Sequence, residues 1–205
     1  MAIDMQQSTL RLLWEADELV LDLGALQGLW TVEQYLKLTD QTNRLIEFAA
    51  GYVEVLPMPT RRHQVILALL YELFVGFLRP RGGKVLFAPL RLQVRPSTYR
   101  EPDLLLLLDA NDPRNQNAFW LGADLVIEIV SPDDPERDIR VKRADYAEAG
   151  IPEYWIVNPL EETITVLLLD GDAYTEHGIF HRSQSATSAL LDGFVVQVDE
   201  VFDAS

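Results

Sequence analysis

The stretch "DLVIEIVSPDDPERDIRVKRADYAEAGIPEYWIVNP", residues 124–159, carries the pattern on which the fold class depends. Its first part, "LVIEIV", is apolar except for Glu128, and Ser131-Pro132 ends this run. Helical spacing follows over about 137–149, and Gly150 is a typical residue for the end of a helix. The segment "PEYWIVNP" then predicts a second buried strand. A strand, a helix and a further strand indicate a layered architecture around a central sheet.

The flanking sequence extends this pattern in both directions. Upstream, "RLIEFAAGYVEVLPM" alternates around Ala50-Gly51 and predicts a hairpin, and Thr60 precedes the helical run "RRHQVILALLYELFVGFLRP". Strands are predicted at about 84–95, 102–109 and 124–131. Downstream, a hairpin is predicted to turn at 170–172, and the tail adds a short strand. We therefore predict a mixed α/β (α+β) fold with a central mixed β-sheet flanked by helices and extra C-terminal strands.

Composition sets limits on the class of protein. The chain has 205 residues, a formal net charge of −15 and no cysteine, so disulfides and thiolate chemistry are excluded. No apolar run reaches the roughly 18 residues of a membrane span, and the N-terminus lacks the pattern of a signal peptide. We expect a cytoplasmic protein with an acidic N-terminal extension, 1–30, and a single domain, 31–205.

The charge is unevenly distributed. Residues 44–100 carry nine basic and three acidic side chains, a net +6 (9 − 3), so the rest of the chain sums to −21. A second basic cluster, "RDIRVKR", occupies 137–143. Two interpretations of these basic residues are open. They lie on ordinary solvent-exposed faces of helices and strands, or they form a localised surface that binds the phosphates of a nucleic acid.

Two carboxylates stand on neighbouring apolar strands. Asp103 follows Pro102 where "EPDLLLLL" begins, and Glu128 lies in the middle of its strand. A buried carboxylate is normally paired, protonated or bound to a metal. Oxygen ligands from two such residues suit Mg²⁺ or Mn²⁺. The alternative is that Glu128 pairs with a basic residue to hold the fold, and that Asp103 only turns the chain.

A lysine on the following helix completes this set. Asp138, Lys142 and Tyr146 are spaced i, i+4 and i+8, so they form one stripe, and Lys142 reaches a strand-borne acid if the stripe faces the sheet. A lysine beside two carboxylates and a metal can position a water nucleophile. Asp138 is also explained by the helix dipole, and Tyr146 by packing with its hydroxyl at the rim.

With these residues in place, the chain resembles the PD-(D/E)XK restriction-endonuclease-like nucleases, through "PD" on one strand and an acid on the next. More specifically, "EIVSPDDPERDIRVKRADYAEAGIPEYWIVNP" and "RLIEFAAGYVEVLPMPTRRHQVI" are similar to the Uma-type family of that superfamily. The resemblance implies a restriction-endonuclease-like core and metal binding by Asp103 and Glu128. It also places Glu47 and His63 within the matching motifs as candidate helpers, although a hairpin ion pair and a helix-capping or packing role explain them too.

The chain departs from the superfamily pattern at two positions. Val130 stands where a lysine is expected two residues after the second acid, and Lys142 is the candidate replacement from the next helix. Asn158 stands where related sequences tend to show an aspartate. The resemblance implies a Mg²⁺-dependent endonuclease acting on DNA, and a homodimer. The alternative is a catalytically inactive scaffold that serves as a binding or assembly module, which Val130 and the net charge favour.

Overall fold

The computed structural model of the chain describes residues 9–14, 17–42 and 44–205. Two compact units are present: a small unit of residues 1–58 and 95–101, and a large unit of residues 59–94 and 102–205. The boundary drawn in sequence at residue 30 between an extension and a single domain stays a prediction, because part of that extension lies outside the described residues.

The described part of the small unit contains a two-stranded sheet, three strands of a second sheet, and one α-helix. Its elements are β1 (Thr9–Trp14), β2 (Asp17–Asp22), the 3₁₀ turn η1 (Gly24–Leu26), α1 (Val32–Thr39), β3 (Ile46–Ala49), β4 (Tyr52–Val55) and β7 (Thr98–Arg100). The hairpin between β3 and β4 is confirmed, and its two turn residues, Ala50 and Gly51, have positive φ angles of 48° and 89°. The expected capping box of Thr31 and Gln34 begins α1. Tyr35 stacks on Phe48 at 5.2 Å between ring centroids and forms the core of this unit with its neighbours.

The large unit is built on a six-stranded mixed sheet in the order β12-β11-β10-β9-β8-β5. Its strands are β5 (Lys84–Phe87), β8 (Leu104–Leu107), β9 (Leu125–Ile129), β10 (Glu153–Asn158), β11 (Thr163–Asp170) and β12 (Ala173–Phe180). Strand β9 runs parallel to β10 and antiparallel to β8, so β9 lies inside the sheet and all five of its residues are buried. The predicted mixed α/β fold is confirmed. The strand expected over 84–95 is instead two strands, β5 and β6 (Leu92–Arg95), with Pro89 between them.

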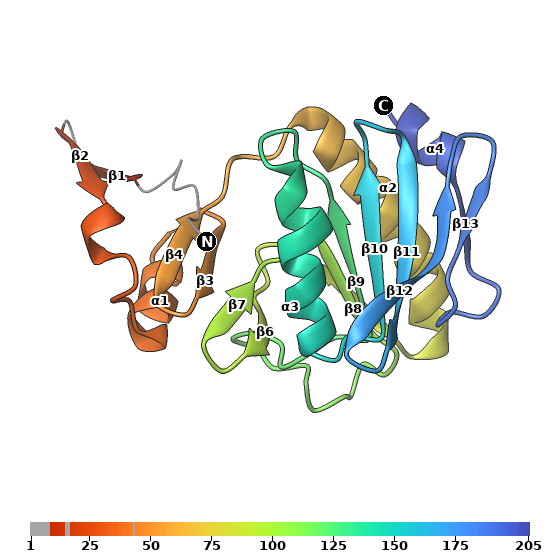
Figure 1. The fold of residues 1–205 in the computed structure, drawn as a ribbon, viewed down its shortest axis with the longest axis horizontal. Helices are drawn as coiled ribbons and strands as arrows, with labels where there is room; N and C mark the ends of the chain where they lie inside the picture. The colour runs from red at the N-terminus through yellow and green to blue at the C-terminus, as the bar shows by residue number, and fades with distance from the viewer. Residues whose placement is uncertain (1–8, 15–16, 43) are drawn as a thin grey trace. The chain divides into compact units, whose positions relative to one another are not determined.

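Alternating side chains of the sheet supply two separate cores. Leu104, Ile127 and Ile129 point to the face covered by α2 (Arg61–Leu78), where Phe74 packs edge-on against Trp155 at 5.5 Å. The opposite face carries Leu105, Val126 and Val130, and α3 (Lys142–Glu148) covers it (Figure 1). Because successive strand residues alternate, Glu128 projects toward α3.

The connection between β9 and β10 is not the regular helix that the sequence predicted. It begins as a π-helical turn, η3 (Arg137–Val141), and continues directly into α3. Turns of this kind insert an extra residue into the helix and are frequently found at functional sites.

The C-terminal segment completes the core on the side of α2. It contains β13 (Ser185–Thr187), β14 (Val195–Gln197) and a helix that the sequence did not predict, α4 (Val198–Asp203). Phe194 lies 4.4 Å from Phe74 between ring centroids, and Val198, Val201 and Phe202 belong to the same core. None of the helices in the described part of the chain has the length and apolar character needed to cross a membrane.

Candidate active site

The site lies where β8 and β9 run side by side beneath α3. Leu104 pairs with Ile127 in the antiparallel register, so the next residue along, Asp103, stands opposite Glu128. The backbone amide of Ile129 donates a hydrogen bond of 2.7 Å to Oδ2 of Asp103, which holds this carboxylate at the end of β9. The two predicted acids are therefore brought together by strand pairing.

Lys142 lies between two carboxylates. Its Nζ atom is 2.8 Å from Oε2 of Glu128 and 3.0 Å from Oδ1 of Asp138. The lysine side chain is only 6% exposed, and those of Glu128 and Asp138 are 2% and 7% exposed. In such a weakly solvated place an ion pair is much less screened than at the surface. The expected contact between the helix lysine and the strand acid is present.

Tyr146 holds the other oxygen of Glu128. Its hydroxyl donates a hydrogen bond of 2.5 Å to Oε1, and the residue is fully buried. Tyr146 packs in the core as expected, but its hydroxyl lies in the interior beside Glu128 and not at the rim. The stripe of residues 138, 142 and 146 faces the sheet, so one helix face supplies both contacts to Glu128.

Asp138 lies in the first turn of η3, where the helix dipole favours an acid, and it is also buried and forms an ion pair with Lys142. This contact joins two members of the stripe 138, 142 and 146 that the i, i+4 spacing predicted. The backbone carbonyl of Asp138 also accepts a hydrogen bond of 2.8 Å from the hydroxyl of Tyr154.

Burial and charge keep the Tyr154 hydroxyl protonated. Burial raises the pKa of Tyr154 well above its usual value, and the charges of Glu128 and Asp138 add to this effect, followed by Tyr174 and Asp103. Tyr154 therefore acts as a hydrogen-bond donor at the site and not as a phenolate.

His63 reaches Asp103 from the first turn of α2. Its Nε2 atom is 3.1 Å from Oδ1 of Asp103, and Thr60 caps the helix beneath it with a hydrogen bond to the His63 amide. Burial lowers the pKa of His63, but the hydrogen bond and charge of Asp103 and the charge of Asp138 outweigh burial and the opposing charge of Lys142. The pKa of His63 is consequently raised above 6.5, which favours a protonated ring beside Asp103. The other ring nitrogen, Nδ1, is buried without a hydrogen-bond partner among the described residues.

Val130 occupies the position where the superfamily carries its lysine. It is 1% exposed and belongs to the core between the sheet and α3, together with Val126 and Tyr146. The Lys142 ammonium nevertheless reaches the carboxylate of Glu128 from the neighbouring helix. A positive charge is thus present beside the second acid although the strand itself provides none.

The donor chemistry of the site fits a hard cation. Asp103 and Glu128 supply carboxylate oxygens from adjacent strands, and Mg²⁺ typically uses one or two carboxylates and keeps several waters. Over residues 9–14, 17–42 and 44–205, no group of three or more His, Asp or Glu side chains has a metal-holding arrangement. The two strand carboxylates therefore fit as a partial ligand set that water would complete.

Glu47 lies in the small unit, in a buried ion pair. Its Oε2 atom is 2.7 Å from Nη1 of Arg100, and its Oε1 accepts the backbone amide of Glu101 at 3.1 Å. Glu47 is fully buried and the Arg100 side chain is 7% exposed. The structure therefore groups Asp103, Glu128, Lys142 and His63 in the large unit and places Glu47 in a different cluster.

The basic segment 44–100 contributes residues to both units. Arg100, one of its phosphate-binding candidates, is buried in an ion pair with Glu47. Arg62 forms an ion pair of 3.1 Å with Glu162. In the second basic cluster, Arg140 pairs with Glu136 and Arg143 donates to the carbonyl of Tyr174.

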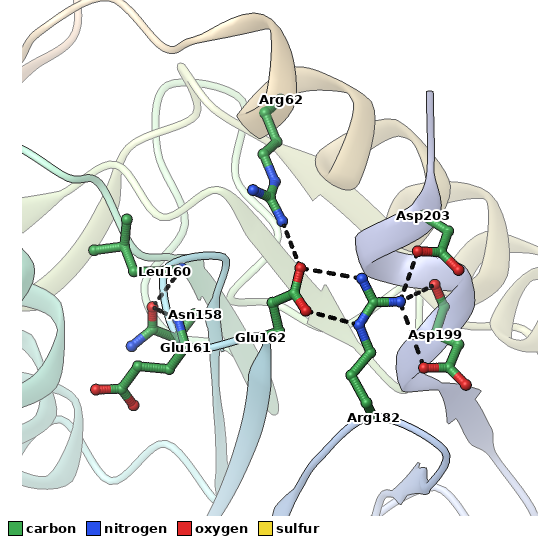
Figure 2. A network of polar contacts seen from close by, with 8 residues as sticks. All are labelled: Arg62, Asn158, Leu160, Glu161, Glu162, Arg182, Asp199 and Asp203. Carbon is green, nitrogen blue, oxygen red and sulfur yellow. Dashed lines mark hydrogen bonds and ion pairs between the residues drawn. The ribbon is translucent and has the colours of Figure 1, made fainter.

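Asn158 has a structural part at the end of β10. Its Oδ1 atom accepts the backbone amides of Leu160 at 3.0 Å and Glu161 at 3.3 Å, a geometry that an aspartate would also provide (Figure 2). The same turn presents Glu162, whose two oxygens accept hydrogen bonds from Arg182. Asn158 therefore shapes this turn without supplying a charge.

Comparisons with known proteins identify the family of the chain and a solved structure of similar fold. The family model described as "Uma2: Putative restriction endonuclease" matches residues 32–199, and the chain belongs to this family. Among solved structures, the chain is similar to one described as "a putative nuclease belonging to DUF820" from Anabaena variabilis ATCC 29413. That similarity has a TM-score of 0.70 at 20% sequence identity, and covers 85% of this chain and 98% of the other. A comparison with curated proteins gave no match.

Proposed function

We propose that this protein is a divalent-metal-dependent nuclease that hydrolyses phosphodiester bonds, with DNA as its substrate. The observation that carries the proposal is the Lys142 ammonium 2.8 Å from Glu128, on the strand beside Asp103. Membership in a restriction-endonuclease family supports the same reaction class.

In this proposal Asp103 and Glu128 hold Mg²⁺ or Mn²⁺. The cation, when bound, acts as a Lewis acid that polarises the phosphate and favours ionisation of a nearby water. Lys142 orients the attacking water and offsets negative charge that develops on the phosphate oxygens. The water oxygen forms a bond to phosphorus, the bond from phosphorus to the leaving sugar oxygen breaks, and one proton passes from the water to solvent while the leaving oxygen takes up another.

His63 is the residue placed to assist this step. Its ring contacts Asp103, and the raised pKa of His63 extends the pH range in which the ring is protonated. A protonated imidazole at the edge of the site can stabilise the phosphate or deliver a proton to the leaving oxygen.

The test is cleavage of supercoiled plasmid and of single-stranded oligonucleotides with Mg²⁺ or Mn²⁺. We expect cleavage by the wild-type protein that EDTA abolishes, and loss of it in Glu128→Ala and Asp103→Asn. Glu176→Gln is the control, because Glu176 is an exposed residue of β12 and the substitution also removes one carboxylate. Cleavage that survives Glu128→Ala, or no cleavage by wild type in any condition, contradicts the proposal.

A second candidate is a nuclease-like scaffold that binds a partner without catalysis. The observation that favours it is the extent to which the acids are already satisfied: Glu128 contacts Lys142 and Tyr146, and Asp103 contacts His63 and the Ile129 amide. Calorimetric titration with Mn²⁺ separates the two candidates. The nuclease should bind Mn²⁺, and Asp103→Asn should weaken this binding, whereas the scaffold requires no bound cation.

A further inference from the structure

Asp138 shares the ammonium of Lys142 with Glu128. The two distances are nearly equal, 3.0 Å to Asp138 and 2.8 Å to Glu128. Both acids are buried, so water does not replace either contact freely. The lysine charge is therefore divided between a helix carboxylate and the strand carboxylate that the proposed reaction uses.

The same segment contains an exposed pair with identical spacing. Arg140 lies 2.8 Å from Glu136, also at i, i+4, with side chains 79% and 67% exposed. Exposed pairs of this kind contribute little because water screens them. Asp138 and Glu136 thus differ in environment and in their partner, and not in sequence separation.

The formal charges of the site depend on Asp138. Asp103, Glu128 and Asp138 carry three negative charges and Lys142 carries one positive charge, so these four groups sum to −2. Without the Asp138 charge the sum is −1, and of the two carboxylates that contact the Lys142 ammonium only Glu128 is left. A cation that needs Glu128 would then compete with the full charge of the lysine.

We propose that Asp138 is a positioning residue that retains the Lys142 ammonium when Glu128 engages a divalent cation. This inference rests on the proposed function. When Glu128 binds the cation, the Lys142 ammonium keeps its ion pair with the buried Asp138 carboxylate. The ammonium then stays beside the cation without competing with it for Glu128. The π-helical turn carries Asp138 into this place, four residues before Lys142.

The test measures Mn²⁺ binding by calorimetry on the full chain without nucleic acid. Asp138→Asn keeps the shape of the side chain and the backbone contact to Tyr154 but removes the charge. Glu136→Gln is the matched control, since it removes the same charge from the exposed pair of the same segment. Lys142→Met and the double variant Asp138→Asn with Lys142→Met show whether the effect passes through the lysine. Asp138→Glu restores the carboxylate, and circular dichroism confirms that each variant is folded.

We expect Asp138→Asn to weaken Mn²⁺ binding at least about tenfold, as residues that support a metal ligand commonly do. Glu136→Gln should change it by less than about twofold, and Asp138→Glu should recover part of the loss. In the Lys142→Met background the effect of Asp138→Asn should fall to about twofold, because no ammonium remains to be redirected.

Three outcomes overturn the inference. Unchanged affinity in Asp138→Asn shows that Asp138 does not hold the lysine away from the cation. If Asp138→Asn lowers the Mn²⁺ affinity equally in the wild-type and Lys142→Met backgrounds, Asp138 acts on the cation directly. Absence of Mn²⁺ binding by wild type removes the proposed metal function as well, and this result is distinguished from the first two because the wild-type protein itself then fails.

Discussion

The Nζ atom of Lys142 lies 2.8 Å from Oε2 of Glu128, although one residue belongs to a helix and the other to a strand 14 positions earlier (142 − 128). This contact places the Lys142 ammonium beside Glu128, the second acid of the site. Val130 occupies the position where the superfamily pattern has a strand lysine, and its side chain packs in the core.

Lys142→Met should strongly destabilise the metal-free protein. It leaves Glu128 and Asp138 buried without their shared cation, and breaking a buried pair costs about 3–5 kcal/mol. Urea denaturation in EDTA measures the change in the free energy of unfolding. Adding Glu128→Gln to this variant should recover part of the loss, since one of the two uncompensated charges is then gone. A double variant less stable than Lys142→Met contradicts this explanation.

Tyr146→Phe isolates the hydroxyl contact to Glu128. The ring keeps its packing against Tyr154, at 5.1 Å between centroids, while one hydrogen bond to a charged acceptor is lost. We expect a loss of about 1.5–3 kcal/mol in the free energy of unfolding, measured by chemical denaturation. Tyr52→Phe, at an exposed tyrosine of the small unit, is the control and should be nearly neutral. Equal effects would show that the Glu128 contact is unimportant.

His63 should titrate above the usual histidine value in the metal-free protein. Its raised pKa stabilises the fold at pH values below the unfolded-state pKa, about 6.5, and this contribution is lost as the pH rises through the higher folded-state pKa. Titration of the ring proton signals by NMR measures the pKa, with His63→Gln to assign the resonance. Asp103→Asn should lower the pKa, because the partner that stabilises the charged ring is removed. A pKa unaffected by Asp103→Asn would contradict this cause.

Glu47→Gln distinguishes a structural role of Glu47 from a catalytic one. It removes the carboxylate charge that faces the buried guanidinium of Arg100 at 2.7 Å, and breaking a buried ion pair costs about 3–5 kcal/mol, so we expect a loss of stability of up to about this size. Cleavage per amount of folded protein should stay unchanged at a temperature where the variant remains folded. A large fall in cleavage with intact folding would instead support the helper role that the sequence motif suggested.

Arg182→Ala should loosen the C-terminal helix selectively. Arg182 connects Glu162 with Asp199 and Asp203 of α4, and Glu162 also receives Arg62 from α2 (Figure 2). Hydrogen exchange of the amides at 198–203 should become faster, while exchange in β9 stays as in wild type. High salt should produce a weaker effect of the same kind in the wild-type protein, because these groups are exposed and screened. Uniform acceleration over the whole chain would contradict a local role.

The sequence by itself identified the strands of the central sheet, the long helix and the two strand acids. Period-two and helical spacing located β9, α2 and the hairpins, because burial of one face imposes those periods on apolar residues. Glu128 was recognisable since a carboxylate inside an apolar strand needs a compensating partner. The stripe of 138, 142 and 146 was also readable, because helical geometry places those residues on one face.

Only the tertiary structure decided which partners these groups take. Strand pairing sets Asp103 opposite Glu128, and the packing of α3 on the sheet turns Lys142 and Tyr146 toward one carboxylate. Asp138 entered the site through a π-helical turn, and Glu47 was bound instead by Arg100, 53 residues away. Contacts between residues far apart in sequence depend on how the helices and strands pack. The spacing of residues within one helix or strand does not determine that packing. The pattern of residues thus identifies the acids, whereas the fold decides that a buried lysine is shared between two of them.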